Sequence, residues 1–383
     1  MQNPFRYGAI ATGNYFADRV VELTELEADI RNGHNVVIIS PRRYGKTSLV
    51  FRALEHLKQE RILFAYLDLF RTPTKDRFAD RLADSIYSGL VAPFERARHR
   101  ALEIFRSLPT QPTVTINPDG TPSFQFGAAQ HARDVDRTIE SLLTLPGMIA
   151  AQRGRRIAVI LDEFQEVVAI DPHLPALMRA VFQLQGGVAH VFMGSRRHLM
   201  QRVFTDENQP LYRLARPLSL RPIDVDDFAT FIRGRFASTR KQVTDDTIDR
   251  VLAITEGHPN DTQELCYFTW AIAQAEGSPP TTGMVDRALN QVVEAEAARY
   301  TTLWEQLSVH QRLVLSALVV GGEGVFSEAY RRQHRLGSAS SVQRSLDRLL
   351  ERDLVELLPE RRYRVPDVFL RAWITRLTSS NGP

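Results

Sequence analysis

Cysteine is almost missing from this chain, since Cys266 is the one cysteine among 383 residues. A lone cysteine excludes an intramolecular disulfide framework and favours a reducing compartment. No apolar run approaches the ~18 residues that a membrane-spanning helix needs, and the first residues lack a basic segment followed by an apolar one. We therefore expect a cytoplasmic protein with no membrane partner.

The chain also lacks a large excess of positive or negative charge, because its formal net charge is only +3. With 43% hydrophobic and 24% charged residues, the composition is typical of a globular protein rather than a disordered or fibrous one. The length exceeds the size at which one hydrophobic core usually stops growing. No repeat of 20–50 residues points to a solenoid. Two or three packed domains are expected.

Short apolar runs alternate with helix-like segments in the first half of the chain, as in a parallel sheet covered by helices. Helices are predicted at about 47–58 and 174–183, and helical sequence follows the second strand through Arg106. A hairpin insertion at about 110–130 is predicted by period-two alternation around Asn117-Pro118-Asp119-Gly120. The predicted buried strands are Val36–Ile39, Leu63–Leu69, Ile157–Leu161 and Ala189–Met193.

Helical periodicity dominates after Asp224, with helices expected at 224–236, 244–256, 260–276 and 281–299. From Ser308 the pattern changes to three further helices, at 308–320, near 327–334 and from Ser338 onward. Two short strands then flank Pro359-Glu360-Arg361-Arg362. Three helices and a two-stranded wing describe a winged helix-turn-helix. We expect an α/β core at 1–222, a helical domain at 223–300 and a winged-helix domain at 301–383.

A phosphate-binding loop is predicted directly after the first strand, where the next helix begins. Such a loop needs a glycine where backbone N–H groups wrap the β-phosphate, a lysine that reaches the β and γ oxygens, and a hydroxyl for Mg²⁺. Gly45, Lys46 and Thr47 meet these needs, and the helix N-terminus adds further N–H groups. The predicted nucleotide-binding residues are Pro41, Arg42, Arg43, Tyr44, Gly45, Lys46, Thr47 and Ser48.

Two carboxylates follow the buried strand Ile157–Leu161. A carboxylate at the end of a buried strand is costly unless a cation meets it, and Mg²⁺ at the phosphate loop would be that cation. Asp162 is therefore predicted to bind the metal with Thr47, and Glu163 to polarise the attacking water as general base. The alternative is an ordinary helix cap after a strand.

On these residues the chain resembles the AAA+-like archaeal/bacterial ATPase family that is related to the STAND signalling ATPases. The resemblance spans nearly the whole chain and implies a P-loop parallel sheet with a helical lid domain and a C-terminal winged helix. Its most specific carrier is the arginine-rich loop. The carriers are Asn3-Pro4-Phe5, Tyr15–Arg19, Pro41–Leu49, Leu161–Gln165 and Phe192–Ser195.

The resemblance also implies roles for residues outside these two motifs. Arg19 would lie beside the adenine, or be only a surface charge at a helix start. Ser195 would act as a catalytic sensor of the γ-phosphate, or simply end a strand. Gly257-His258-Pro259 resembles the turn that brings the lid onto the nucleotide, so His258 and Pro259 would bind there, although a plain turn fits equally.

Two positions depart from the family pattern. Ser40 replaces the usual first glycine of the loop, which is tolerable if its backbone angles are not restricted to glycine. The arginine of the usual proline-x-tyrosine-glycine-arginine pattern is also shifted. An arginine finger for a neighbouring subunit could therefore be Arg196, Arg213 or Arg216, or each could form a surface ion pair.

The winged helix has two possible partners. If it binds duplex DNA, its third helix would enter the major groove through Arg344 and Arg348, while Arg361, Arg362 and Arg364 would contact phosphates. Nearby acidic residues dilute this basic face, so a protein-contact module is the alternative.

The function expected from these features is that of an ATP-hydrolysing switch with Mg²⁺, slow or partner-stimulated, whose output passes through the winged helix. The alternatives are a DNA-binding regulator, or a signalling scaffold that forms an ATP-dependent homo-oligomer, in which the nucleotide is structural and hardly hydrolysed.

Overall fold

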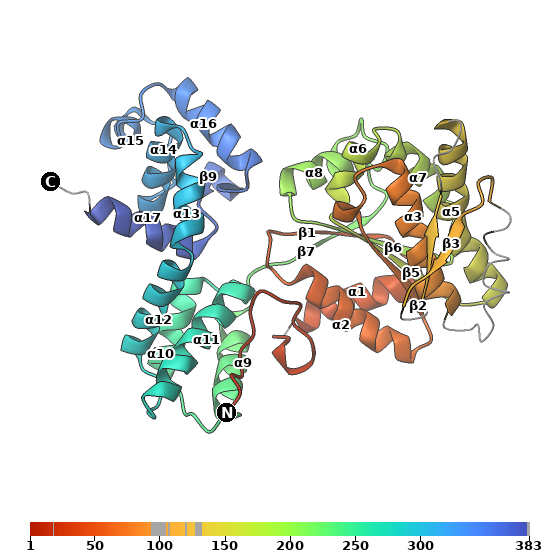
Figure 1. Ribbon diagram of the computed structural model, residues 1–383. Coiled ribbons are helices and arrows are strands. Elements are labelled where there is room, and N and C mark those ends of the chain that lie inside the picture. Colours follow the sequence, from red (N-terminus) through yellow and green to blue (C-terminus); the bar gives the residue numbers. More distant parts are fainter. Residues whose placement is uncertain (18, 93–104, 106–107, 119–120, 127–131, 381–383) are drawn as a thin grey trace. The chain divides into compact units, whose positions relative to one another are not determined.

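The computed structural model describes residues 1–17, 19–92, 105, 108–118, 121–126 and 132–380. Most of the helical sequence predicted between residue 92 and Arg106, and the turn of the predicted hairpin at 119–120, lie outside these residues. The chain forms two compact units (Figure 1). One is Arg19–Arg221; the other combines Met1–Asp18 with Pro222–Pro383, so the N-terminal segment groups with the later residues.

A five-stranded parallel sheet forms the centre of the Arg19–Arg221 unit, with the order β2-β5-β6-β1-β7. Its strands are β1 (Val36–Ile39), β2 (Leu63–Asp68), β5 (Ile157–Asp162), β6 (Val188–Gly194) and β7 (Arg216–Ser219). All residues of β5 and β6 are buried, as expected for central parallel strands covered on both faces. The four predicted strands are confirmed.

The fifth strand, β7, was not predicted. Its sequence Arg-Pro-Leu-Ser contains one apolar side chain that is buried, Leu218, and it pairs with β1 alone at the edge of the sheet. Proline cannot donate a hydrogen bond and is therefore tolerated in edge strands. An edge strand of this composition carries no periodic signal.

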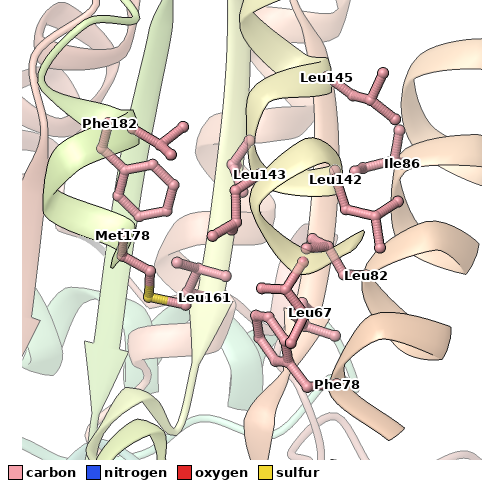
Figure 2. Packing of buried hydrophobic residues seen from close by; sticks show 14 of the residues in the cluster. Leu67, Phe78, Leu82, Ile86, Leu142, Leu143, Leu145, Leu161, Met178 and Phe182 are labelled. Carbon is pink, nitrogen blue, oxygen red and sulfur yellow. The ribbon is translucent and has the colours of Figure 1, made fainter. Parts of the chain in front are cut away.

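Helices cover both faces of the sheet (Figure 1). The helices α1 and α2 lie on one face, and α3, α5 and α7 on the other. Figure 2 shows leucines of α5 packed between α3, α7 and the strands β2 and β5. The bounds are α1 Val20–Asn32, α2 Lys46–Gln59, α3 Lys75–Ile86, α5 Ala132–Arg153, α6 Val167–Ile170, α7 Leu174–Phe182 and α8 Arg197–Thr205.

The predicted hairpin is an antiparallel pair of β3 (Thr113–Ile116) and β4 (Pro122–Gln125). Two carboxylates of α3 hold it, because Asp84 accepts from the Phe124 N–H at 2.8 Å and Asp80 from the Phe126 N–H at 2.8 Å. Burial raises the pKa of both carboxyl groups. Two carboxylates of α3 therefore bind hairpin N–H groups that a neighbouring strand would otherwise bind.

Helices α9 to α13 follow in the second unit, where α9, α10 and α11 match the predicted ones to within one or two residues. The single helix expected at 281–299 is wrong, because the structure breaks it at Glu296 into two. The break turns Tyr300 inward, where it is 1% exposed and its hydroxyl donates to Asp367 at 3.2 Å. The bounds are α9 Val225–Ala237, α10 Asp245–Thr255, α11 Pro259–Ala275, α12 Thr282–Ala295 and α13 Ala297–Glu305.

The last residues form the predicted winged helix-turn-helix, followed by one more helix. Serine caps begin its three helices, since Ser308, Ser327 and Ser338 each accept a backbone N–H in the first turn. Among the described residues, no helix combines the length and apolar character needed to cross a membrane. The elements are α14 Val309–Val320, α15 Glu328–Gln333, α16 Ala339–Glu351, β8 Glu356–Leu358, β9 Arg362–Arg364 and α17 Val368–Ser380.

Candidate active site

The loop between β1 and α2 turns through two left-handed residues, Arg43 with φ 63° and Gly45 with φ 83°. A Cβ at Gly45 would meet no neighbour within 4 Å, so backbone conformation rather than space requires glycine there. Left-handed residues within a loop turn successive N–H groups into one concavity, which favours an anion. Ser40 is not among the described residues with positive φ, so this serine causes no backbone conflict.

Lys46 begins α2 and its side chain turns back into the loop. Its Nζ donates to the carbonyl oxygens of Ser40 and Pro41, each at 3.0 Å. Burial lowers the pKa of this ammonium to about 8, although the nearby carboxylates of Glu163 and Asp162 act in the opposite direction. Two neutral carbonyls hold the lysine, and phosphate oxygens would compete strongly for the same donor.

Asp162 ends β5 and receives three hydrogen bonds from neutral donors. Its Oδ1 accepts the Glu163 N–H at 2.9 Å, and its Oδ2 accepts the Tyr66 hydroxyl at 2.6 Å and the Thr47 hydroxyl at 3.4 Å. Burial raises the pKa of this carboxyl group, while the bonds from Tyr66 and Glu163 lower it. The phosphate loop and the end of β5 are thus directly connected.

Glu163 follows in a left-handed conformation, with φ 49° and ψ 43°. Its Oε2 accepts the Ser195 hydroxyl at 2.9 Å and also the side-chain amide of Gln165. Ser195 comes directly after β6, which neighbours β5, and is 3% exposed. A Cβ at Gly194 would lie 2.6 Å from Oε1 of Gln165, so this glycine makes room for the amide. The predicted base and the predicted sensor are therefore in contact.

Arg19, just before α1, contacts the phosphate loop through its side chain. It is 5% exposed, and its guanidinium donates to the Tyr44 carbonyl at 3.1 Å and to Glu22 at 2.9 Å. Burial lowers its pKa. The alternative interpretation of Arg19 as a surface charge at a helix start is therefore wrong. Within the loop, Arg42 and Arg43 are exposed, whereas Tyr44 and Ser48 are buried.

His258 and Pro259 belong to the other unit, at the start of α11. The His258 ring accepts the Asp261 N–H at 3.3 Å and so caps the helix, and Pro259 occupies the first helical position. The turn before them is tight, since a Cβ at Gly257 would meet the Ile223 carbonyl at 2.9 Å. The helix cap accounts for these two residues locally.

The three candidate finger arginines differ in their surroundings. Arg216 donates to Asp29 and to Glu25, and these bonds raise its pKa. Arg213 lies over the Tyr212 ring at 5.1 Å, and Arg196 lies 3.7 Å from Glu166. Arg216 and Arg196 thus form ion pairs, which were the alternative to a finger role.

Two polar residues at this site were missed as functional residues. The sequence pattern assigns Tyr66 only to a strand and Gln165 only to the motif that follows the strand Ile157–Leu161. Both contact the paired carboxylates through a side chain. A phenol two residues before the end of β2 is the signal that could have found Tyr66. Because burial and the Asp162 charge raise its pKa, Tyr66 keeps its proton.

The basic face of the winged helix is exposed and partly neutralised. Arg344, Arg348, Arg361 and Arg362 are all exposed. Arg348 pairs with Glu351 at 2.8 Å, and Arg362 lies 3.6 Å from Glu323. The guanidinium of Arg364, also expected at phosphates if the module binds DNA, pairs with Glu356 and Glu256 in this structure. The four predicted DNA-contacting arginines are therefore solvent-exposed, and two of them pair with carboxylates.

A parallel sheet with a phosphate loop, paired carboxylates and a winged helix is the arrangement of a P-loop ATPase. The chain belongs to the family described as an ATPase domain predominantly from Archaea, whose model matches residues 16–265. A model described as a probable winged helix domain matches residues 298–376. The protein is an ATPase.

Three solved structures have a similar fold. The Walker-type ATPase PABY2304 of Pyrococcus abyssi is 18% identical with a TM-score of 0.67, over 97% of this chain and 99% of that one. The Aeropyrum pernix ORC2 protein, in ADPNP–ADP complexes, is 13% identical with a TM-score of 0.54, over 98% and 100%. The Aeropyrum pernix ORC1 protein in complex with DNA is 14% identical with a TM-score of 0.50, over 98% of both chains. No curated protein matches the chain.

Proposed function

We propose that the loop Ser40–Thr47 binds ATP with Mg²⁺ and that the carboxylates at the end of β5 convert binding into hydrolysis. The contacts Thr47–Asp162 and Ser195–Glu163 carry this proposal, because they join the phosphate loop, β5 and β6 into one polar cluster. The buried lysine and the N-terminus of α2 supply the positive charge that phosphates need. Arg19 supports the loop through the Tyr44 carbonyl.

The residues at this edge fit a magnesium ion. Asp162 is only 7% exposed, and its hydrogen-bond donors are neutral hydroxyl and backbone groups. A buried carboxylate with neutral donors favours a cation, and hydroxyl and carboxylate oxygens are the ligands that Mg²⁺ prefers. Thr47 would hold the ion directly and Asp162 through its hydration shell. When bound, the ion neutralises charge on the β- and γ-phosphates.

Glu163 acts as general base in this proposal. Its carboxylate takes the proton of the water that attacks the γ-phosphorus, while the Ser195 hydroxyl senses the γ-phosphate. In this structure one oxygen of Glu163 is occupied by Ser195 and Gln165. The proton must therefore go to the other oxygen of Glu163, or to this one after a bond is released, which supports slow or partner-stimulated turnover.

The test separates binding from chemistry. Glu163→Gln keeps a hydrogen-bonding side chain but loses the base, so ATP affinity should stay within about threefold while single-turnover hydrolysis falls by about 10²-fold or more. Glu140→Gln, at an exposed position on α5, is the matched control and should hydrolyse ATP normally. Unchanged hydrolysis by Glu163→Gln would overturn the assignment of the base.

We further propose that the chain has three domains, which are an ATPase core at 1–222, a helical domain at 223–300 and a winged helix at 301–383, and that the winged helix transmits the effect of ATP. Nucleotide state would change how the later residues engage the core, and His258 and Pro259 would respond to ATP at the start of α11. Duplex DNA is the proposed partner of the winged helix. The exposed Arg344, Arg348, Arg361 and Arg362 support it, because such side chains favour contacts to phosphate.

A second candidate function follows from the occupied base. If the bonds from Ser195 and Gln165 persist with ATP bound and keep the carboxylate away from the attacking water, the nucleotide is hardly hydrolysed and serves a structural role. The protein would then be a DNA-binding regulator or a signalling scaffold that forms an ATP-dependent homo-oligomer. Turnover distinguishes these functions from the first.

A further inference from the structure

A phenol from β2 reaches the carboxylate at the end of β5. Tyr66 pairs with Ile160 in the parallel register of β2 and β5, two residues before the ends of both strands. Its hydroxyl spans that offset and donates to Oδ2 of Asp162 at 2.6 Å. At neutral pH a phenol is protonated and is a strong donor to an ionised carboxylate.

Tyr66 is held at its ring and at its backbone. The Phe51 ring on α2 lies 5.3 Å away, and the Ser85 hydroxyl on α3 donates to the Tyr66 carbonyl at 2.8 Å. The ring therefore packs on the helix that begins at the phosphate loop, and the backbone that carries it is bound to α3. A donor fixed in this way orients its acceptor, because neither the strand nor the packed ring moves freely.

Tyr66 and Thr47 meet at one oxygen atom. The Thr47 hydroxyl lies 3.4 Å from the same Oδ2 of Asp162, and Oδ1 is bound by the Glu163 N–H. The carboxylate thus has a fixed orientation before any ligand arrives. Without the phenol, Oδ2 would keep the longer contact to Thr47, and the carboxylate would be oriented mainly by the Glu163 N–H.

We propose that Tyr66 is a positioning residue for the metal site, which holds the Asp162 carboxylate in the orientation that binds Mg²⁺ with ATP. The proposal rests on the proposed function of Asp162 and Thr47. Tyr66 does not touch the nucleotide in this account. It acts through Asp162, so its removal should weaken the contribution of the metal and leave nucleotide binding without metal unchanged.

The experiment measures the equilibrium affinity of the full chain for a fluorescent ATP analogue, once in EDTA and once across a Mg²⁺ titration. For Tyr66→Phe we expect unchanged affinity in EDTA and about a tenfold higher Mg²⁺ concentration at half-maximal enhancement, as for other residues that orient a metal ligand. Tyr87→Phe removes another half-buried phenol of the same unit, one that packs on Phe124, and should have no effect.

A double-mutant comparison tests whether Tyr66 acts through Asp162. If Tyr66 acts through Asp162, Tyr66→Phe should cause no further loss when added to Asp162→Asn. An unchanged Mg²⁺ titration for Tyr66→Phe, an equal loss in EDTA, or an additive loss on top of Asp162→Asn would each overturn the proposal. Failure of Asp162→Asn itself to alter the Mg²⁺ dependence would instead contradict the proposed function.

Discussion

The proposed nucleotide site and the basic surface of the winged helix use polar groups in opposite ways. At the nucleotide site, Lys46, Asp162 and Ser195 are buried and hydrogen-bonded to other residues of the site. On the winged helix, Arg348 and Arg362 are exposed, and each pairs with a carboxylate of the same module.

This difference determines how each region should respond to substitution. A buried polar group that loses its partner costs the full desolvation penalty of that group, whereas an exposed ion pair contributes about 0–1 kcal/mol. The nucleotide site should therefore behave as one cooperative unit. The winged-helix surface should behave as a sum of small, salt-dependent contributions.

The largest effect is expected for Lys46→Ala, which removes a buried charge from the proposed nucleotide site. Charge-assisted hydrogen bonds contribute about 1.5–3 kcal/mol each, so the loss of this ammonium should weaken ATP binding by about 100-fold or more. Titration calorimetry measures the affinity. Lys58→Ala, at the exposed end of the same helix, is the matched control and should bind ATP normally. Normal binding by Lys46→Ala would remove the lysine from the site.

Raising the pH should weaken the same interaction without a mutation. The pKa of Lys46 is lowered to about 8 in the free protein, mainly by burial. Phosphates bind the protonated form, so affinity is full below this pKa and is lost as the pH rises through it. Measured in EDTA, ATP affinity should be about tenfold weaker at pH 9 than at pH 7. Lys46→Arg stays charged and should show no such loss; a flat profile for the wild type would contradict the assignment.

The exposed arginines should give a smaller, additive effect. Arg344→Gln combined with Arg348→Gln should weaken binding to duplex DNA by about three- to tenfold and reduce the slope of log affinity against log salt by about two. Fluorescence anisotropy across a salt series measures both quantities. Arg250→Gln removes an exposed arginine of the same unit outside the winged helix. An equal loss in that control would show that general charge, not α16, binds DNA.

The smallest effect is expected at the ion pairs that join the winged helix to the turn before α11. Glu256, with φ 52°, binds Arg364 of β9 and Arg371 of α17. These side chains are 22–40% exposed, so Glu256→Gln should cost at most about 1 kcal/mol and lower the Tm by a few degrees. The exposed pair Arg332–Glu328 offers a control, Glu328→Gln, with a smaller shift. A larger loss of stability would make Glu256 part of a cooperative network.

The sequence predicted those features that short motifs encode. Lys46 and Thr47 are adjacent in the chain, and Asp162 and Glu163 directly follow an apolar strand, so both groups could be recognised from local pattern alone. That they would meet followed from the parallel sheet, whose strands end at one edge.

The remaining features depend on contacts between distant residues. Tyr66 reaches Asp162 only because β2 and β5 are neighbours in a particular register, which no local pattern specifies. The partners of Arg364 come from residues 8 and 108 positions away. The break at Glu296 contains no proline or glycine, and it accompanies the burial of Tyr300 against the C-terminal helix. Tertiary packing decided each of these.

The most direct test of the account is steady-state ATP hydrolysis by the purified protein across a protein concentration series, with and without duplex DNA, beside Glu163→Gln as the blank. We expect slow turnover above the blank that rises with DNA or with protein concentration. A rise with concentration would favour a finger arginine supplied by a neighbouring subunit. Turnover no higher than the blank under every condition would contradict the account and favour a nucleotide with a structural role.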